Sequence, residues 1–334
     1  MKQIQLGNDT FEGRNSVYLL GHTTDAAGPL TLVDTGVATD ATDAELRAAL
    51  AECGVDYADL DRILLTHWHY DHAGLAGQIQ TESGAEVYVH EADAPLVAQD
   101  PEATEAVREL QFEEFADWGM PAAKRAELES FFEGSEDLRG EPVDVTPVTD
   151  GDRLAAGEHE VRVVHLPGHA AGLVAYVFER EGRREAFLGD SVLPKYTPNV
   201  GGADVRVEEP LANYLASLER VVDLDLDRGW PGHRGPIFAP TARAHDIAEH
   251  HAERAERVLA VLREHGPATP WEVSAELFGS LSNVHIMHGP GEAYAHLDHL
   301  AARGWAERTD DGYTLAADAP VDVHLDALRG ESGQ

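Results

Sequence analysis

The stretch Thr66-His67-Trp68-His69-Tyr70-Asp71-His72 constrains this chain more than any other part of it. Four of its seven side chains can bind a metal ion, and it follows the apolar run 63–65, which is typical of a buried strand. A short loop at a strand end can turn His67 and His69 to one side and Asp71 with His72 to another, so one loop could hold two neighbouring cations. Imidazole with carboxylate favours zinc, with manganese or ferrous iron as alternatives, over calcium or magnesium.

This stretch resembles the H-x-H-x-D-H signature of the metallo-β-lactamase-fold hydrolases, and four further motifs of that family match in chain order. They are Thr31-Leu32-Val33-Asp34-Thr35-Gly36, Leu166-Pro167-Gly168-His169, Phe187-Leu188-Gly189-Asp190 and Trp230-Pro231-Gly232-His233. Five motifs in the right order are far more specific than any one of them. The resemblance covers residues 1–240 and implies an α/β fold, an αββα sandwich with a dinuclear metal site at the sheet edge.

The resemblance implies seven metal ligands. They are His67, His69, Asp71, His72, His169, Asp190 and His233. In the family, an aspartate at the position of Asp34 supports the ligand loop without touching the metal; turn formation before Thr-Gly is the alternative role for Asp34. His90, His159 and His165 match no family motif, and we expect them to be ordinary residues.

The expected chemistry is hydrolysis assisted by two Zn²⁺ ions. Three neutral imidazoles leave a fourth position for water, as in zinc hydrolases that form hydroxide near neutral pH. A hydroxide between the two cations would attack an ester, thioester or phosphoester, with Asp71 orienting it and Asp190 bridging the cations, so these are the expected catalytic residues. The zinc β-lactamases lack the bridging aspartate, whereas glyoxalase II, other thioesterases and the nucleases of the fold have it. The resemblance therefore disfavours an antibiotic as the substrate, and of the remaining classes we expect an acyl ester or thioester.

The segment after Asp190 is the expected substrate-binding loop. A loop that directly follows the bridging ligand projects into the pocket, so Lys195, Tyr196 and Asn199 are candidates for binding an anionic or carbonyl-bearing substrate. A rigid loop flanked by Pro194 and Pro198 is the alternative.

Residues 91–144 interrupt the strand pattern. Helices are expected at 102–118 and 121–132, and they carry all the aromatic side chains of this segment, Phe112, Phe115, Trp118, Phe131 and Phe132. We interpret the segment as an inserted helical cap whose aromatic side chains shape an apolar substrate channel. Attachment of the two helices to the sandwich by these side chains is the alternative.

Residues 241–334 predict three helices, at 242–265, from 269 onward and at 292–303, followed by a hairpin around 310–312. This order resembles a winged helix, with an αα-linker as the alternative. A winged helix suggests nucleic acid, and a metal-dependent endoribonuclease is the second hypothesis. The third helix, however, carries Glu292 and Asp298 with Arg303, which is not a phosphate-binding face.

We therefore expect the C-terminal part to pack against the catalytic part, to form a homodimer or to close the pocket. His285 and His288 could form a pocket wall or have no role. A noncatalytic binding module is the third hypothesis, disfavoured because all seven ligands are present.

The charge balance predicts the cellular setting. The chain has 25 Lys and Arg against 61 Asp and Glu, a net charge of −36, spread over its whole length. Such a surface repels itself unless salt screens it, so we expect a protein from the cytoplasm of a halophile. No stretch is apolar enough to span a membrane, no targeting segment is recognisable, and Cys53, the only cysteine, forms no disulfide within the chain.

Overall fold

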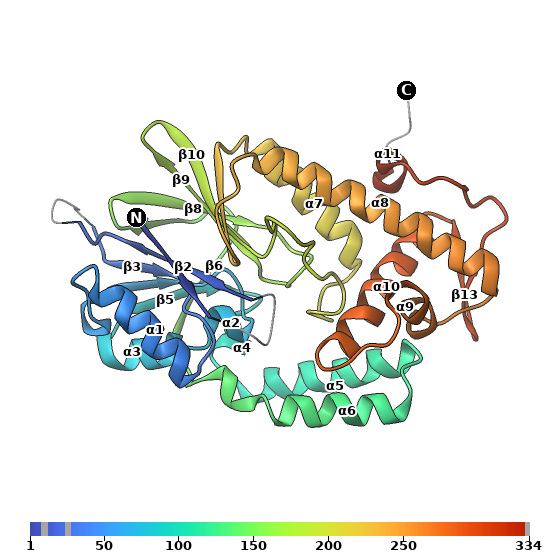
Figure 1. The fold of residues 1–334 in the computed structure, drawn as a ribbon, viewed down its shortest axis with the longest axis horizontal. Helices are drawn as coiled ribbons and strands as arrows, with labels where there is room; N and C mark the ends of the chain where they lie inside the picture. Colours follow the sequence, from blue (N-terminus) through green and yellow to red (C-terminus); the bar gives the residue numbers. More distant parts are fainter. Residues whose placement is uncertain (8–12, 24–27, 331–334) are drawn as a thin grey trace.

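The computed structural model describes residues 1–7, 13–23 and 28–330. Within these residues two large sheets lie face to face, one with the strand order β1-β2-β3-β4-β5-β6 and one with the order β11-β10-β9-β8-β7 (Figure 1). The strands are β1 (Lys2–Leu6), β2 (Asn15–Leu20), β3 (Thr31–Val33), β4 (Arg62–Leu64), β5 (Glu86–His90), β6 (Val145–Val148), β7 (Arg153–Ala156), β8 (His159–His165), β9 (Val174–Arg180), β10 (Arg183–Gly189) and β11 (Arg228–Pro231).

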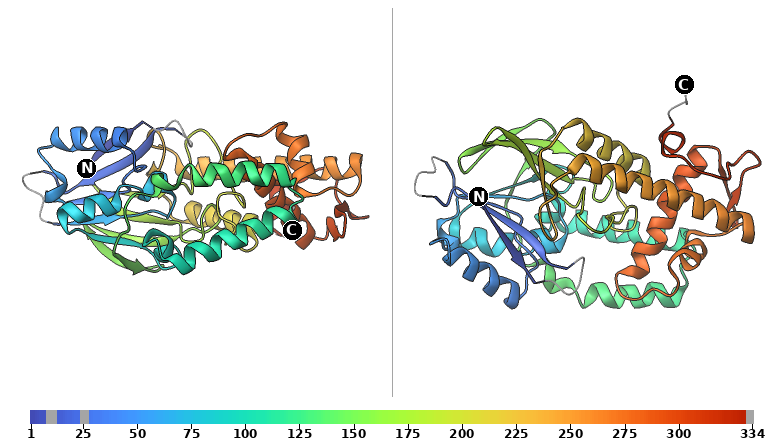
Figure 2. Two further views of the ribbon diagram at one scale, coloured as in Figure 1. Left: turned by 90° about the horizontal axis from the view of Figure 1, so that it is seen from below. Right: turned by 45° about the horizontal axis from the view of Figure 1, so that its top comes forward.

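Helices cover both outer faces of the paired sheets, and a third group lies beside them (Figures 1 and 2). The α-helices are α1 (Asp40–Ala51), α2 (Tyr70–Ala73), α3 (Ala76–Ser83), α4 (Ala94–Val97), α5 (Pro101–Asp117), α6 (Ala122–Glu133), α7 (Pro210–Asp223), α8 (Pro240–His265), α9 (Pro270–Phe278), α10 (His285–Ala302) and α11 (Leu325–Arg329). Two short 3-10 helices, η1 (Tyr57–Asp59) and η2 (Glu136–Arg139), and a hairpin of β12 (Ala306–Thr309) and β13 (Gly312–Leu315) complete the described elements.

Strand β2 shows how the layers are built, because all six of its residues are buried. Val17 and Leu19 pack in the cluster that contains Leu46 of α1, whereas Tyr18 packs with Phe187 of the opposite sheet. Since successive side chains of a strand point to opposite faces, this strand contacts a helix layer on one side and a sheet on the other. The predicted αββα sandwich is confirmed.

The ends of several strands meet at one edge of the sandwich. Strands β3, β4 and β5 are parallel, β10 and β11 are parallel, and β8 runs in the same direction as β10 because both are antiparallel to β9. Each predicted ligand motif follows β4, β8, β10 or β11, and Asp34 follows β3. The topology therefore gathers these motifs at the carboxyl ends of the strands.

The insert between β5 and β6 is attached at its far end to the C-terminal helices. Phe115 and Trp118 are buried in a cluster with Ile286 and Met287 of α10, and the backbone N–H of Trp271 donates to the carbonyl oxygen of Trp118 at 2.9 Å. The insert is a helical hairpin, as predicted, and its buried aromatic side chains pack in a cluster with residues of α9 and α10 and with Val205 of the sandwich part.

The C-terminal part has the predicted order of three helices and a hairpin. The winged-helix assignment and a domain boundary at residue 240 stay predictions. Helix α10 begins at His285, seven residues before the predicted Glu292, although Pro290 lies inside it. Packing of Ile286 and Met287 on the insert accounts for this early start, because tertiary contacts override a local helix breaker.

One apolar cluster joins the C-terminal helices to the second sheet. Leu211 and Leu215 of α7 lie in it together with Leu259 of α8 and Leu297 of α10, and it also includes Val164 of β8. The C-terminal helices therefore share a hydrophobic core with the second half of the sandwich. Throughout the described ranges, each helix is too short or too polar to reach across a bilayer.

Candidate metal centre

The seven predicted ligands converge at the edge where the strand ends meet. Four of them come from the loop after β4, where helix α2 carries Asp71 and His72, and the ring of His72 lies 4.2 Å from that of His67, centre to centre. His169 follows β8 across a short turn, and the remaining two ligands come directly after β10 and close after β11. The convergence brings together residues from 67 to 233 of the chain.

Two glycines of the motifs are required by close backbone approaches. Gly168 has a φ of 143°, and a Cβ there would come within 2.5 Å of the Cβ of Tyr214. A Cβ on Gly232 would come within 2.4 Å of Oδ1 of Asp190 and 2.5 Å of Cε1 of His72. The chain can therefore turn into His169 and His233 only with glycine before each of them.

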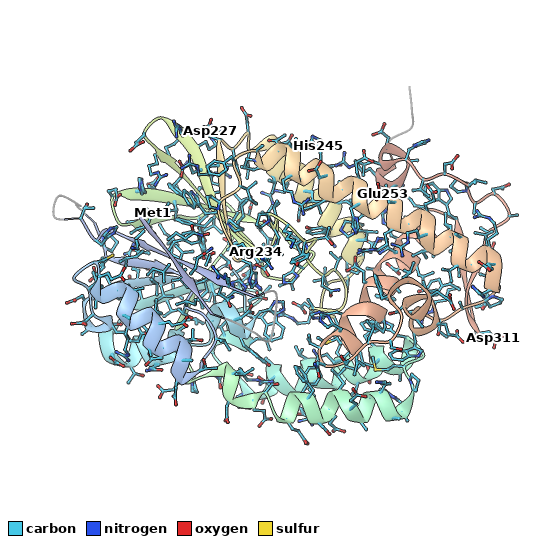
Figure 3. The ribbon with its side chains drawn as sticks, viewed as in Figure 1. Met1, Asp227, Arg234, His245, Glu253 and Asp311 are labelled. Carbon is cyan, nitrogen blue, oxygen red and sulfur yellow. The ribbon has the colours of Figure 1, made fainter. Side chains whose placement is uncertain are left out.

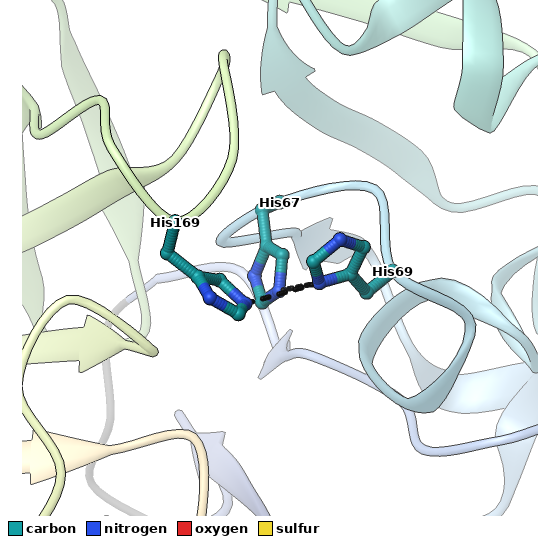
Figure 4. Close-up of side chains that lie close together, drawn as sticks. All are labelled: His67, His69 and His169. Carbon is teal, nitrogen blue, oxygen red and sulfur yellow. Dashed lines mark hydrogen bonds between the residues drawn. The ribbon is translucent and has the colours of Figure 1, made fainter. Parts of the chain in front are cut away.

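His67, His69 and His169 form the first ligand cluster (Figure 4). Nε2 of His67 lies 2.9 Å from Nδ1 of His69, and Nε2 of His169 lies 3.1 Å from the same Nδ1. The three nitrogens come from three separate rings, and they face one point. This is the set of ligand atoms that a tetrahedral cation would take from three imidazoles.

The other ring nitrogen of each of these histidines is directed to a protein acceptor. Nε2 of His69 lies 3.1 Å from the carbonyl oxygen of Ala203, and Nδ1 of His169 lies 2.8 Å from that of Asn199. Nδ1 of His67 lies 3.0 Å from the hydroxyl of Thr66. These bonds assign the ring protons to the outer nitrogens, so the three inner nitrogens present lone pairs to one another, as metal-binding histidines do.

Asp71, His72 and His233 form the second ligand cluster, and Asp190 groups with His72 and with His67 of the first cluster. Nε2 of His233 lies 3.2 Å from Oδ2 of Asp190 and 3.4 Å from Oδ2 of Asp71. Nε2 of His72 lies 3.6 Å from Oδ1 of Asp190, and Nε2 of His169 in the first cluster lies 3.7 Å from Oδ2 of the same carboxylate. Asp190 thus lies between the two clusters, where a bridging ligand would be.

The electrostatics of the site separate the two clusters. Burial lowers the pKa of His69 to about 4, with His169 adding to this effect, and burial lowers the pKa of His67 well below its usual value, so the imidazoles of His67 and His69 are neutral near pH 7. Burial opposes charge on His72 as well, but Asp71, Asp190 and Asp34 outweigh it and raise the pKa of His72 well above its usual value. The carboxylates around the second cluster therefore create an electrostatic field that favours positive charge.

Buried polar atoms that lack a hydrogen-bond partner show whether these residues are suited to bind a metal. Nε2 of His72, Nε2 of His233 and Oδ1 of Asp190 are buried and have no hydrogen-bond partner among the described residues. An unsatisfied buried polar atom is costly, and all three point at the second cluster. Together with the lone pairs of the first cluster, they fit two cations bound by histidine and carboxylate.

Asp34 is linked by hydrogen bonds to both clusters, to the first through Thr66 and to the second through His72. Its Oδ1 accepts the backbone N–H of Thr66 at 2.8 Å, and its Oδ2 accepts the Thr66 hydroxyl at 2.9 Å and Nδ1 of His72 at 2.9 Å. Asp34 is buried and has a φ of 58°, a conformation in which Asp is enriched. It lies where the positioning role predicted for it requires, since it fixes one ligand of each cluster directly or through Thr66.

Sequence reasoning missed a buried network around the first cluster. Nη2 of Arg206 contacts Asp93 at 2.7 Å and Asp204 at 2.5 Å. Asp93 accepts the backbone N–H of Trp68 at 3.1 Å, and Asp204 accepts the indole N–H of Trp68 at 3.2 Å and the backbone N–H of Ala171 at 2.9 Å. The network ties the loop that carries His67 and His69 to the turn after His169. No local pattern distinguishes these two aspartates from the other acidic residues.

The predicted substrate residues divide into two groups. Tyr196 and Asn199 line the cavity at the metal centre, whereas Lys195 is exposed and does not line it; its ammonium group lies 5.0 Å from the centre of the Tyr196 ring. Their role in substrate binding stays a prediction. His90 and His165 stack on each other at 4.0 Å, and neither they nor His159 belong to a candidate metal cluster of the described residues.

The metal centre opens into a cavity of about 870 Å³. One wall is the metal centre, a second is the α5–α6 insert with Phe112, Phe131 and Phe132, and a third is the start of α10. Arg139 and several glutamates lie among these apolar side chains. The half-buried aromatic rings of the insert therefore face the cavity, as the cap interpretation expects of them.

Comparison with known proteins agrees with the geometry. The chain is 28% identical over 283 residues to the Probable metallo-hydrolase YqjP of Bacillus subtilis (strain 168), covering 82% of this chain and 85% of that protein. It is 25% identical over 274 residues to the Beta-lactamase-like protein 2 homolog of Caenorhabditis elegans, covering 81% and 73%. The crystal structure of the metallo-beta-lactamase family protein TTHA1429 from Thermus thermophilus superposes with a TM-score of 0.81 at 33% identity, covering 94% and 98%.

The sequence profile of the metallo-beta-lactamase superfamily matches residues 10–233, the part of the chain that supplies all seven ligands. The helices of the C-terminal part lie outside the matched range. The chain belongs to the metallo-beta-lactamase superfamily and is a metal-dependent hydrolase.

Proposed function

We propose that this protein is a dinuclear metal hydrolase that cleaves acyl esters or thioesters. The observation that carries the proposal is the position of Asp190, whose two oxygens approach His72 at 3.6 Å on one side and His169 at 3.7 Å on the other. A carboxylate between two histidine clusters suits a pair of cations that act on one substrate.

The cations in the proposal are zinc, with manganese or iron(II) as alternatives, and when bound they supply a Lewis acid and an activated water. The chain's own residues provide the rest. Nδ2 of Asn15 donates to Oδ2 of Asp71 at 3.1 Å and so orients this carboxylate toward the second cluster. The cavity beside the ligands is partly apolar, and Tyr196 and Asn199 lie where they can contact the substrate.

A small acyl substrate agrees better with the charge of the chain than RNA does. The net charge is −36, and the cavity wall carries Glu105, Glu129, Glu133 and Glu136 beside its apolar side chains. A phosphate backbone would meet repulsion along this wall, whereas an uncharged acyl group would meet aromatic rings. We place the protein in the cytoplasm of a salt-rich cell on the basis of the same charge.

The test begins with elemental analysis of the purified protein and continues with thioester, ester, lactone and phosphodiester substrates in molar potassium chloride. We expect two divalent metal ions per chain and turnover of thioesters or esters. The variant His69→Ala should lose metal and at least about 1,000-fold in activity, because removal of a ligand disrupts the group that carries the chemistry. The matched control is His245→Ala, a histidine exposed on α8 (Figure 3).

Two results would contradict the proposal. Cleavage of RNA that His69→Ala abolishes, with esters and thioesters left intact, would identify a ribonuclease. A metal-loaded protein that turns over none of the substrates would indicate a binding module.

A further inference from the structure

Helix α10 brings an imidazole from the C-terminal part of the chain into the cavity of the metal centre. His288 lines the same cavity as His69, Asp71 and His169. Its side chain is half-buried, and the ring of His285 lies 5.9 Å away, centre to centre. Among the described residues, no group hydrogen-bonds to the ring nitrogens of His288, so they are available to a molecule bound in the cavity that this residue lines.

The backbone of His288 is fixed relative to the metal ligand His169. Nδ2 of Asn199 donates a hydrogen bond to the carbonyl oxygen of His288 at 3.0 Å. The carbonyl oxygen of Asn199 accepts a hydrogen bond from Nδ1 of His169 at 2.8 Å. The backbones are also close, because a Cβ on Gly202 would come within 2.7 Å of the Cα of His288. One residue, Asn199, therefore holds both histidines.

One turn further along α10, Glu292 secures the same contact. Its Oε2 accepts Nδ2 of Asn199 at 3.0 Å and the backbone N–H of Val200 at 3.1 Å. Glu292 is 4% exposed and is paired with Arg254 of α8. The buried carboxylate of Glu292 thus helps to fix the position of the helix segment that carries His288.

The ring of His288 is a neutral hydrogen-bond donor. Burial lowers the pKa of His288 to about 3, and His285 and His169 add to this effect. A neutral imidazole carries one N–H and one lone pair, so it can donate to an oxygen without adding a charge to the site.

We propose that His288 donates a hydrogen bond to an oxygen of the substrate's acyl group, which makes helix α10 part of the active site. The inference rests on the proposed function, since an acyl group held at the metal centre would place its oxygens beside the cavity wall that His288 forms. The same oxygens are present in the carboxylate product.

The kinetic test compares His288→Ala, His288→Gln and the control His245→Ala in the metal-loaded, full-length protein. Removal of one hydrogen bond to a group that gains charge lowers kcat/KM by about 10- to 100-fold, and we expect this for His288→Ala. Glutamine keeps an N–H at similar reach and should restore most of the loss. Metal content should stay at the wild-type value in every variant, because His288 is not in either ligand cluster.

A binding test separates this inference from the proposed function. Hexanoate serves as the probe for the product carboxylate, and its dissociation constant is measured by calorimetry on metal-loaded protein. We expect His288→Ala to raise the constant about 10-fold and His288→Gln to restore it. If the wild type turns over no ester or thioester, the proposed function fails, while the hexanoate measurement still decides the role of His288.

Three outcomes would overturn the inference. The first is equal binding of hexanoate by His288→Ala and the wild type, and the second is loss of metal in His288→Ala, which would show a structural role. The third is a wild-type protein that binds no hexanoate.

Discussion

At the scale of single residues, Asp34 orients ligands of both clusters although it does not line the cavity. Its two oxygens accept three hydrogen bonds, from the backbone N–H and hydroxyl of Thr66 and from Nδ1 of His72. The bond to His72 keeps the ring proton on Nδ1 and leaves Nε2 for the metal. The Thr66 hydroxyl does the same for His67. Asp34 therefore selects the tautomer of one histidine in each cluster.

The substitution Asp34→Asn tests this role with little change in the backbone, because Asn also tolerates a φ of 58°. If the amide N–H₂ faces His72, the ring must accept there and carry its proton on Nε2, the nitrogen that should bind metal. We expect metal affinity to fall about 10- to 100-fold with the fold intact. Competition with a chelator measures the change, and Asp246→Asn on the exposed face of α8 is the control. Equal metal retention by both variants would contradict the role.

At the scale of elements, α10 links the metal centre to the C-terminal part through one buried carboxylate. Glu292 contacts Asn199, Val200 and Arg254, which come from the loop after β10 and from α8. The first two contacts support the carbonyl group that orients His169. A change at Glu292 should therefore affect both the packing of α10 and the first ligand cluster.

We expect Glu292→Gln to lower the free energy of unfolding by about 3–5 kcal/mol, because it leaves the largely buried Arg254 side chain, which is 11% exposed, without its carboxylate partner. Chemical denaturation measures this loss, and elemental analysis after dialysis should show weaker retention of metal. The matched control is Glu253→Gln, an exposed glutamate one residue from Arg254 on α8 (Figure 3). An unfolding curve equal to that of the control would show that the pair contributes nothing to stability.

The elements also show what sequence could and could not predict. The apolar run 63–65, the alternating polar and apolar pattern before His169 and the order of the motifs are all visible in the sequence, so the fold and the convergence of the ligands could be inferred. Asn15, Asp204 and Glu292 could not, because they contact residues 56 to 136 positions away and have no local pattern. The early start of α10 was missed because Pro290 is typical of a helix breaker when its packing is unknown.

At the scale of the whole molecule, the net charge of −36 predicts a dependence on salt. Screening over a few ångströms at molar ionic strength reduces repulsion between the acidic residues, since the Debye length falls to about 3 Å at 1 M salt. We expect the melting temperature to rise from low salt to 2–3 M potassium chloride, roughly the range in which screening is strongest. A melting temperature that stays level over this range would contradict the halophile hypothesis.

Buried neutral histidines between α8 and α10 predict a dependence on pH. Burial lowers the pKa of His296 to about 3, with Arg254 adding to the effect, and the pKa of His251 is lowered well below its usual value by burial and by His296. The unfolded chain binds protons at these residues below pH 6.5, roughly the ordinary histidine pKa, and the native protein does not, so stability falls as the pH is lowered.

The test compares wild type and His296→Asn, both without metal, at pH 7.5 and pH 5. For a lowered pKa the loss begins at the unfolded-state value and continues down to about pH 3 for His296. At pH 5 it amounts to about 2 kcal/mol for one such group. The variant should therefore lose less stability between the two pH values, and equal losses would contradict the assignment.

The contact between the tip of the insert and α9 has a consequence for what can reach the metals. The α5–α6 hairpin is joined to the sandwich at its base and to Trp271 at its tip, and a Cβ on Gly119 at that tip would come within 2.8 Å of Thr269. A helical hairpin that is held at both its base and its tip cannot swing away from the metal centre as a hinged lid would. Substrates therefore reach the metal centre through an opening whose width the fold determines and not through the movement of a lid.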